Sequence, residues 1–180
     1  MATKTLITVE DFVKMQTPET EAYELVDGEL ILLSSATPLH SIVRGRLERL
    51  IGNFFADHPL GGALSETDCR ISDDTVRKPD LSIILGPRWL ALDLRAVPVP
   101  FAPDIAVEVF SPSEHVVDVN RKVKDYLKAG SQEVWLLDTE NIELHIRTHT
   151  AIRLLLGKDS LQSPLLPGFT VSVETLLSAR

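Results

Sequence analysis

The chain has 180 residues, a formal net charge of −8, 44% hydrophobic residues and 24% charged residues. This length predicts a single domain over residues 1–180 that buries roughly two-thirds of the surface of its unfolded chain. The hydrophobic content excludes a disordered chain. The acidic balance argues against broad binding of polyanions, because nucleic-acid-binding surfaces are usually basic.

Cysteine use and hydropathy both point to the cytoplasm. Cys69 is the single cysteine, so no disulfide within the chain is possible and nothing requires an oxidising compartment. Glu10 and Asp11 interrupt the N-terminal sequence before a signal-peptide apolar stretch could form. No apolar run approaches the roughly 20 residues of a membrane helix. We therefore expect a cytoplasmic protein with no membrane partner.

The N-terminal part of the chain predicts a short helix followed by a β-hairpin. Thr8 is a favourable N-cap for a helix that ends before Pro18. The β-prone runs 22–26 and 29–33 are joined by an Asp-Gly pair, which is the strongest short signal for a hairpin. A longer helix is predicted over 38–58, with proline in its first turn.

The rest of the chain alternates strands and helices. A helix is expected over 116–129, closed by Gly130 in a left-handed conformation, and the proline-bearing segment 86–103 is interpreted as a long connection. This order predicts an α/β fold with a mixed β-sheet flanked by helices, an N-terminal helix and hairpin, and a C-terminal β-hairpin. The expected strands are 63–71, 80–85, 104–110, 133–138, 142–147 and 152–156, and the last helix is 173–177.

One acid of the strand 104–110 stands where a carboxylate is costly. Alternation puts Glu108 on one face with Ala106 and Phe110, and both faces of this strand are apolar. A buried acid needs a partner, a raised pKa or a metal ion. Asp80 opens another buried run. Because neighbouring strands lie about 4.8 Å apart, one acid from each strand could bind the same divalent ion.

A lysine of the helix 116–129 is the third candidate. On a helical wheel, Lys122 lies at the margin of the apolar stripe beside Tyr126. From there it could reach a cluster of acids and orient or deprotonate a metal-bound water. It could equally pack its alkyl stem beside Tyr126 or pair with Asp118. The other charged residues of the helix, expected to face further outward, are Arg121, Lys124, Asp125 and Lys128.

Short motifs follow one another in a characteristic order along nearly the whole chain. They are Thr8–Phe12, Tyr23–Glu29, His40, Lys78–Asp80, Val107–Ser113, Asp118, Lys122, Tyr126, Ala129–Gly130, Glu133–Asp138 and Leu166–Phe169. In this order the chain resembles the Uma family, described as putative restriction endonucleases and formerly as a domain of unknown function. That family belongs to the PD-(D/E)xK nuclease superfamily.

The resemblance implies a restriction-endonuclease-like core and a site for Mg²⁺ or Mn²⁺. Asp80 matches the acid of the family's Pro-Asp motif, and Glu108 matches the acid two positions before the usual lysine, so both are the expected metal ligands. The usual lysine position holds Phe110 here, which makes Lys122 on the following helix the candidate catalytic lysine. Glu24 and His40 match positions that the family also carries.

The expected function is that of a metal-dependent endonuclease that hydrolyses DNA phosphodiester bonds. Asp80, Glu108 and Lys122 are the expected catalytic residues, and Glu24 and His40 would position the ion or the substrate phosphate. From the residues alone, Glu24 could instead be a cross-strand salt-bridge partner in the hairpin, and His40 a solvated residue at a helix start.

Two other classes of function stay open at this point. One is a catalytically silent nuclease-fold module for binding or regulation, and the other is a hydrolase of a small phosphoester. The net charge predicts weak binding of DNA with pronounced salt dependence. A homodimer is a further expectation, through the segment 86–103 or the C-terminal hairpin, because cutting two strands benefits from two sites.

Overall fold

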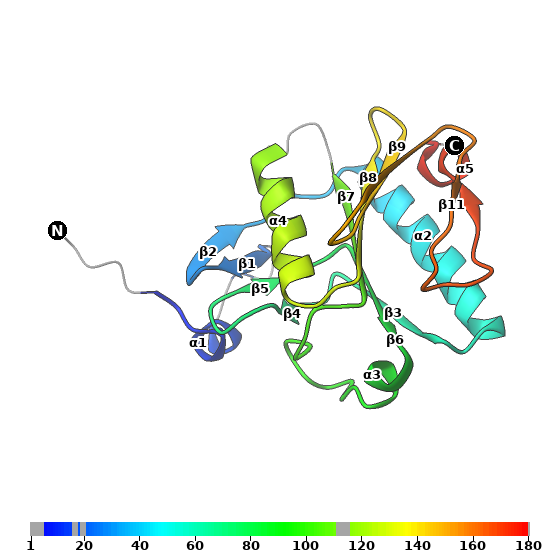
Figure 1. The fold of residues 1–180 in the computed structure, drawn as a ribbon. Helices are drawn as coiled ribbons and strands as arrows, with labels where there is room; N and C mark the ends of the chain where they lie inside the picture. The colour runs from blue at the N-terminus through cyan, green and yellow to red at the C-terminus, as the bar shows by residue number, and fades with distance from the viewer. Residues whose placement is uncertain (1–5, 16–17, 19–20, 111–115, 180) are drawn as a thin grey trace.

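The computed structural model describes residues 6–15, 18, 21–110 and 116–179, which fold into a mixed α/β architecture (Figure 1). The helices are α1 (Val9–Lys14), α2 (Pro38–Asp57), α3 (Gly86–Leu90), α4 (Val116–Lys128) and α5 (Val173–Leu177). The strands are β1 (Tyr23–Val26), β2 (Glu29–Leu32), β3 (Gly61–Ser65), β4 (Cys69–Arg70), β5 (Val76–Arg77), β6 (Leu81–Leu85), β7 (Ile105–Phe110), β8 (Glu133–Asp138), β9 (Glu143–Arg147), β10 (Ile152–Leu156), β11 (Ser160–Leu161) and β12 (Val171–Ser172).

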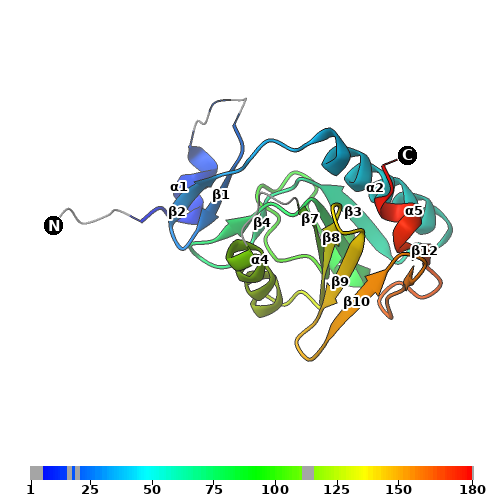
Figure 2. The same ribbon diagram turned by 90° about the horizontal axis from the view of Figure 1, so that it is seen from above.

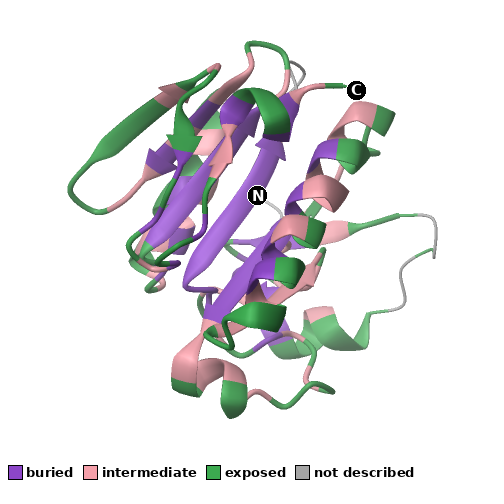
Figure 3. Ribbon diagram, turned by 90° about the vertical axis from the view of Figure 1, so that its right-hand side faces the viewer, coloured by how far each residue is buried: buried purple, intermediate pink, exposed green. Residues whose placement is uncertain are grey.

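The main sheet has six strands in the order β10-β9-β8-β7-β6-β3. β7 and β8 run parallel, and the other neighbours are antiparallel. Helices α2 and α5 cover one face of this sheet, and α4 covers the other (Figure 2). The central strands are buried (Figure 3), as the apolar residues on both faces of 104–110 predict.

A smaller sheet, in the order β2-β1-β5-β4, carries the predicted hairpin. α1 buries Val9 against Leu25 of β1. Asp27 and Gly28 form the turn with φ angles of 48° and 75°, in the left-handed region that glycine adopts at little cost. A Cβ atom on Gly28 would also lie only 2.8 Å from the Cβ of Leu6. Both conditions explain why the turn uses glycine.

The predicted helix ends are confirmed by their capping contacts. The hydroxyl of Thr8 accepts from the N–H of Asp11 at 3.1 Å, and the hydroxyl of Thr37 accepts from the N–H of His40 at 3.2 Å. Gly130 follows α4 with a φ of 105°. Within the ranges that the structure describes, none of the helices is both long and apolar enough to span a bilayer.

The prediction of one strand over 63–71 is wrong. β3 ends at Ser65 in the main sheet, and β4 begins at Cys69 in the smaller sheet. Glu66 turns the chain between them with a φ of 47°. The segment 86–103, interpreted from the sequence as a long connection, also contains the short helix α3. Proline in the first turn favours this helix.

Candidate active site

Strands β6 and β7 bring the two predicted acids together. They pair antiparallel with Leu81 opposite Val107, so Asp80 comes next to Glu108 at the following position of this register. The side chains of Asp80 and Glu108 are 13% and 7% exposed. Val107 and Val109 pack into the core on the α2 side, and the alternation of the strand therefore turns Glu108 toward α4.

Two groups hold the carboxylate of Asp80. His40 Nε2 lies 2.7 Å from Oδ1, and the main-chain N–H of Val109 donates to Oδ2 at 2.7 Å. His40 stands in the first turn of α2, and its side chain is only 17% exposed. The alternative of a solvated His40 is therefore wrong, and the orientation of Asp80 depends on both α2 and β7.

Two groups from one helix hold the carboxylate of Glu108. Lys122 Nζ donates to Oε2 at 2.9 Å, and the Tyr126 hydroxyl donates to Oε1 at 2.6 Å. Lys122 and Tyr126 are four residues apart on α4, so they lie on the same side of the helix. The ammonium group of Lys122 thus reaches an acid of the sheet.

Burial and two nearby carboxylates raise the pKa of Glu108. Burial raises this pKa from the ordinary value of 4.5 to about 7, against the lowering effect of the Lys122 ammonium. The carboxylates of Asp80 and Glu24 raise it further. Carboxylates that repel one another in a partly enclosed site favour the binding of a cation, so this electrostatic arrangement fits a metal site.

A cavity of about 130 Å³ opens onto Asp80 and Glu108. Among the described residues, no three His, Cys, Asp or Glu side chains form a metal-ligand group. An ion here would bind the two carboxylates and complete its shell with water or main-chain oxygen. This donor set fits Mg²⁺ or Mn²⁺, which accept few carboxylates and retain waters, better than a structural Zn²⁺ with four protein ligands. The cavity is lined by Ala22, residues 33–37, His40, Glu66, Lys78, Asp80, Glu108, Val109 and Lys122.

Glu24 binds a buried arginine. Its side chain is 1% exposed, and its Oε2 accepts from Arg77 Nη1 at 2.7 Å. Its Oε1 accepts from the main-chain N–H of Lys78 at 2.9 Å. Arg77 also donates through Nε to Asp125 of α4 at 3.0 Å. Glu24 is thus a salt-bridge partner across β1 and β5, and the expected outward orientation of Asp125 is wrong.

The contacts of Arg77, Lys78 and the Tyr126 hydroxyl in this region were not predicted from the sequence. Arg77 and Lys78 directly precede the Pro-Asp pair, and this basic dipeptide was the available signal. Lys78 Nζ lies 2.8 Å from Asp68 Oδ1, and its side chain lines the same cavity as Lys122. Arg77 and Lys78 therefore both fix the loop that ends at Asp80, through ion pairs with acids of other segments.

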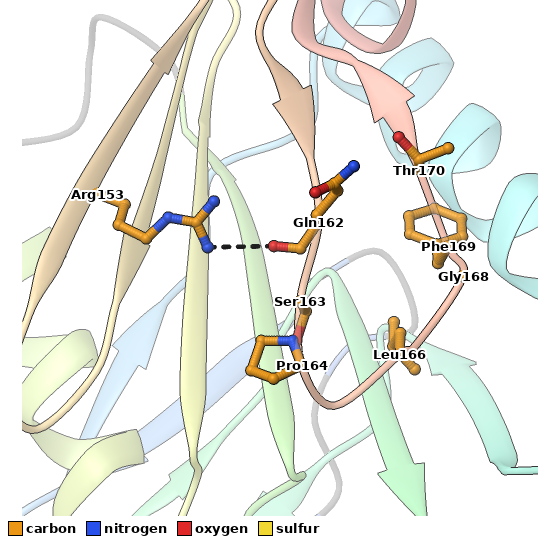
Figure 4. A pocket seen from close by; sticks show the side chains of 8 residues that line it. All are labelled: Arg153, Gln162, Ser163, Pro164, Leu166, Gly168, Phe169 and Thr170. Carbon is orange, nitrogen blue, oxygen red and sulfur yellow. Dashed lines mark hydrogen bonds between the residues drawn. The ribbon is translucent and has the colours of Figure 1, made fainter.

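A second cavity, of about 480 Å³, lies near the C-terminal strands (Figure 4). Arg153 of β10 donates to the carbonyl oxygen of Gln162 across it at 3.2 Å. Its lining holds no acid, histidine or cysteine, so it lacks groups for metal binding or general acid–base chemistry. It is lined by Arg153, Gln162, Ser163, Pro164, Leu166, Gly168, Phe169 and Thr170.

Comparison with known proteins places this site in a family context. The sequence profile of the Uma2 family, described as "Putative restriction endonuclease", matches residues 9–174. The chain belongs to the Uma2 family. The predicted family is thereby confirmed. In this Uma2-family protein the two acids and Lys122 all fall inside the matched range.

Two further proteins are similar to this Uma2-family protein. The crystal structure of a putative nuclease belonging to DUF820 from Anabaena variabilis superposes with a TM-score of 0.84 at 21% identity, covering 95% of this chain and 97% of that one. This likeness confirms the predicted fold, a restriction-endonuclease-like mixed sheet flanked by helices. The uncharacterized protein slr1290 of Synechocystis sp. is 24% identical over 148 residues, which are 76% of this chain and 71% of that protein.

The position of the usual superfamily lysine has a structural role in this Uma2-family protein. Phe110, two residues after Glu108, ends β7 and packs against the apolar cluster of Val123 and Tyr126 on α4. The cation that contacts Glu108 comes from α4 itself, through Lys122. The aromatic side chain of Phe110 therefore helps to fix the position of α4, the helix that carries Lys122.

The pKa of Glu108 predicts how stability changes with pH. Its folded-state pKa of about 7 exceeds the ordinary 4.5, so the folded protein binds the proton more readily between these values. We expect the melting temperature of the metal-free protein to rise as pH falls from 8 to about 5.5. The rise should exceed that of Glu108→Gln over the same range by on the order of 5 °C. Thermal unfolding in EDTA measures this difference, and parallel pH profiles for the two proteins would contradict it.

Proposed function

We propose that this Uma2-family protein is an endonuclease that uses Mg²⁺ or Mn²⁺ to hydrolyse DNA phosphodiester bonds. The observation that carries the proposal is the convergence on one cavity of Asp80, directly before β6, Glu108 of β7 and Lys122 of α4. The family match supports nuclease chemistry of this kind. A silent module would have no need to bring two carboxylates and a lysine together around one cavity.

The acids, the histidine and the lysine of the cavity have distinct roles in this proposal. Asp80 and Glu108 would hold the ion, which supplies an activated water and polarises a phosphate oxygen. His40 and the N–H of Val109 fix the orientation of Asp80. Lys122, 2.9 Å from Glu108, would stabilise the negative charge that develops on the phosphate during attack.

The decisive experiment is a nicking assay on supercoiled plasmid with Mg²⁺ or Mn²⁺. We expect the wild type to nick the plasmid and Glu108→Gln to lose about 100-fold or more of the rate, because a metal ligand is removed. The amide oxygen can still accept from Lys122 Nζ while the amide N–H donates to the hydroxyl oxygen of Tyr126, so the fold should persist. Glu143→Gln, on β9 away from the cavity, is the matched control. Equal nicking by all three proteins would refute the proposal. Cleavage of bis(p-nitrophenyl) phosphate but not of DNA would favour the small-phosphoester hydrolase.

Two copies of the chain are proposed to pair through β10, which forms an edge of the six-stranded sheet. Ile152, Leu154 and Leu156 alternate along β10 and are 62%, 48% and 46% exposed, and an exposed apolar edge strand favours pairing with another strand. We expect Leu154→Lys to convert a dimer to a monomer in light scattering. Leu90→Lys, at an 85% exposed site in the segment 86–103, is expected to stay dimeric. A monomeric wild type at high concentration would exclude the dimer.

We propose that the chain forms one domain over residues 1–180 and lies in the cytoplasm. The buried single cysteine is consistent with that location. Cys69 is fully buried, and burial raises the pKa of its thiol to about 11, so it behaves as a small apolar residue. Its side chain packs with Ile84 and Val99 between the two sheets. No disulfide-forming environment is needed for that packing.

A further inference from the structure

A larger cavity adjoins the proposed active site. It has a volume of about 380 Å³ and shares Leu33, Ser34 and Lys122 with the cavity that holds the two acids. Lys122 therefore stands at the boundary between the two spaces. A phosphate that contacts Lys122 would have the acids on one side and this second space, the side cavity, on the other.

The side cavity lies between the β1–β2 hairpin and α4, which stand next to each other in Figure 1. Its hairpin wall is apolar apart from Glu24, which pairs with Arg77, and Ile31 and Leu32 there are 42% and 57% exposed. Asp118 of α4 also lines this space. Its helix wall carries Arg121, whose Nη2 donates to Asp27 of the hairpin turn at 2.6 Å. That ion pair joins the two walls. The side cavity thus offers apolar surface directly beside a site for phosphate.

The reacting groups lie below the protein surface. The side chains of Asp80, Glu108 and Lys122 are 13%, 7% and 15% exposed. In a DNA duplex the bases are stacked inside, and the grooves between the phosphate ridges are about 12 and 6 Å wide. A stiff duplex can bring its phosphates to a flat surface, but it cannot place a base into apolar space beside a recessed phosphate site without flipping that base.

A single strand meets both conditions. Its bases are free to leave the stack, and proteins that bind single strands without sequence preference commonly give the bases apolar or aromatic surfaces beside a track for the backbone. Single-strand binding still uses a positively charged track for the backbone, but apolar contact with a base adds affinity that does not depend on neutralising phosphates. Such contacts therefore suit a chain whose formal net charge is −8.

We infer that the substrate is single-stranded DNA, including the unpaired segments of a supercoiled plasmid, with one base in the side cavity against Ile31 and Leu32 and the adjoining phosphate at Asp80, Glu108 and Lys122. This inference rests on the proposed function, since it names the substrate of the same site. The base is held by apolar contact, so the site accepts each of the four bases. The hairpin 23–32 thereby acts as a substrate-binding element.

Binding and cleavage together test the inference. The binding probe is a fluorescein-labelled 12-nucleotide single strand, compared by anisotropy with a blunt duplex of the same sequence, using Glu108→Gln with Ca²⁺. We expect the single strand to bind at least tenfold more tightly. We also expect Leu32→Asp, added to Glu108→Gln, to weaken single-strand binding about tenfold through loss of the apolar contact. Leu90→Asp, at an exposed site outside the side cavity, should leave binding unchanged.

The outcomes separate this inference from the proposed function. One outcome is that Glu108→Gln binds single strand and duplex equally, that the wild type cleaves both equally, and that Glu108→Gln cleaves neither. This outcome would overturn the inference and leave the proposed endonuclease function standing. Unchanged single-strand binding in the Leu32→Asp protein would also overturn it. Tight single-strand binding that depends on Leu32, without metal-dependent cleavage of any DNA, would overturn the endonuclease and support the binding site.

Discussion

Replacing Lys122 with methionine is expected to abolish plasmid nicking while leaving the binding of Mn²⁺ nearly intact. Lys122 Nζ lies 2.9 Å from Glu108 Oε2, and its side chain lines the cavity that holds both acids, so it can reach a phosphate bound there. Removing a preorganised group that stabilises transition-state charge typically costs about 100- to 1,000-fold in rate. Methionine keeps much of the side-chain volume beside Tyr126, so the packing of α4 should survive.

The measurement of Lys122→Met combines nicking rates with calorimetric titration of Mn²⁺ at pH 8.5. In the wild type Glu108 is ionised at that pH, which lies well above its pKa of about 7. Loss of the Lys122 ammonium raises this pKa, and the high pH helps the ion to displace the proton from Glu108 in the variant. Lys124→Met is the matched control, since Lys124 lies on the same helix with an exposed side chain. Wild-type nicking by Lys122→Met would exclude a catalytic lysine. Joint loss of nicking and Mn²⁺ binding would assign Lys122 to the metal site instead.

The elements around the site were predictable because their signals are local. The period-two alternation of 104–110 identified a strand buried on both faces, and Glu108 was conspicuous within it. Helical spacing located Lys122 beside Tyr126 on α4. The loss of a lysine at Phe110 was visible in the sequence, and the resemblance to a family directed attention to the following helix.

The contacts between distant segments were not predictable from single-residue patterns. His40 and Asp80 are 40 residues apart, and only the packing of α2 beside β6 brings their side chains to 2.7 Å. Arg77 and Asp125 are 48 residues apart, and a helical wheel placed Asp125 on the outer side of α4. The prediction of one strand over 63–71 was wrong for a related reason, since β-propensity does not specify which of two sheets a strand joins.

These distant contacts share one consequence for the site. The hydrogen bond from Lys78 N–H to Glu24 fixes the chain two residues before Asp80. The ion pair of Arg77 with Asp125 fixes α4 less than one turn beyond Lys122. The smaller sheet thus holds the metal-binding loop and the lysine-bearing helix in one arrangement, through the buried Arg77 in particular.

Replacing Arg77 with methionine is therefore expected to be the most destabilising single change in this region. Arg77 is 5% exposed and pairs with Glu24 and Asp125. Burial lowers the pKa of its guanidinium group, but the carboxylates of Glu24 and Asp125 outweigh this effect and raise the pKa above its ordinary range. Removal of Arg77 leaves Glu24, 1% exposed, as a buried charge without its guanidinium partner. Breaking a buried pair in this way costs about 3–5 kcal/mol, so we expect a loss of that size in the free energy of unfolding.

Urea unfolding at pH 8 measures the effect of Arg77→Met, and Arg70→Met provides the comparison. Arg70 also pairs with two acids, Glu10 and Asp73, but it is 33% exposed, and exposed pairs contribute about 0–1 kcal/mol. In Arg77→Met, the further change Glu24→Gln should restore part of the lost stability, because the buried negative charge is then removed. Equal stabilities of Arg77→Met and Arg70→Met would show that the arginine between β1, β5 and α4 does not hold these elements together.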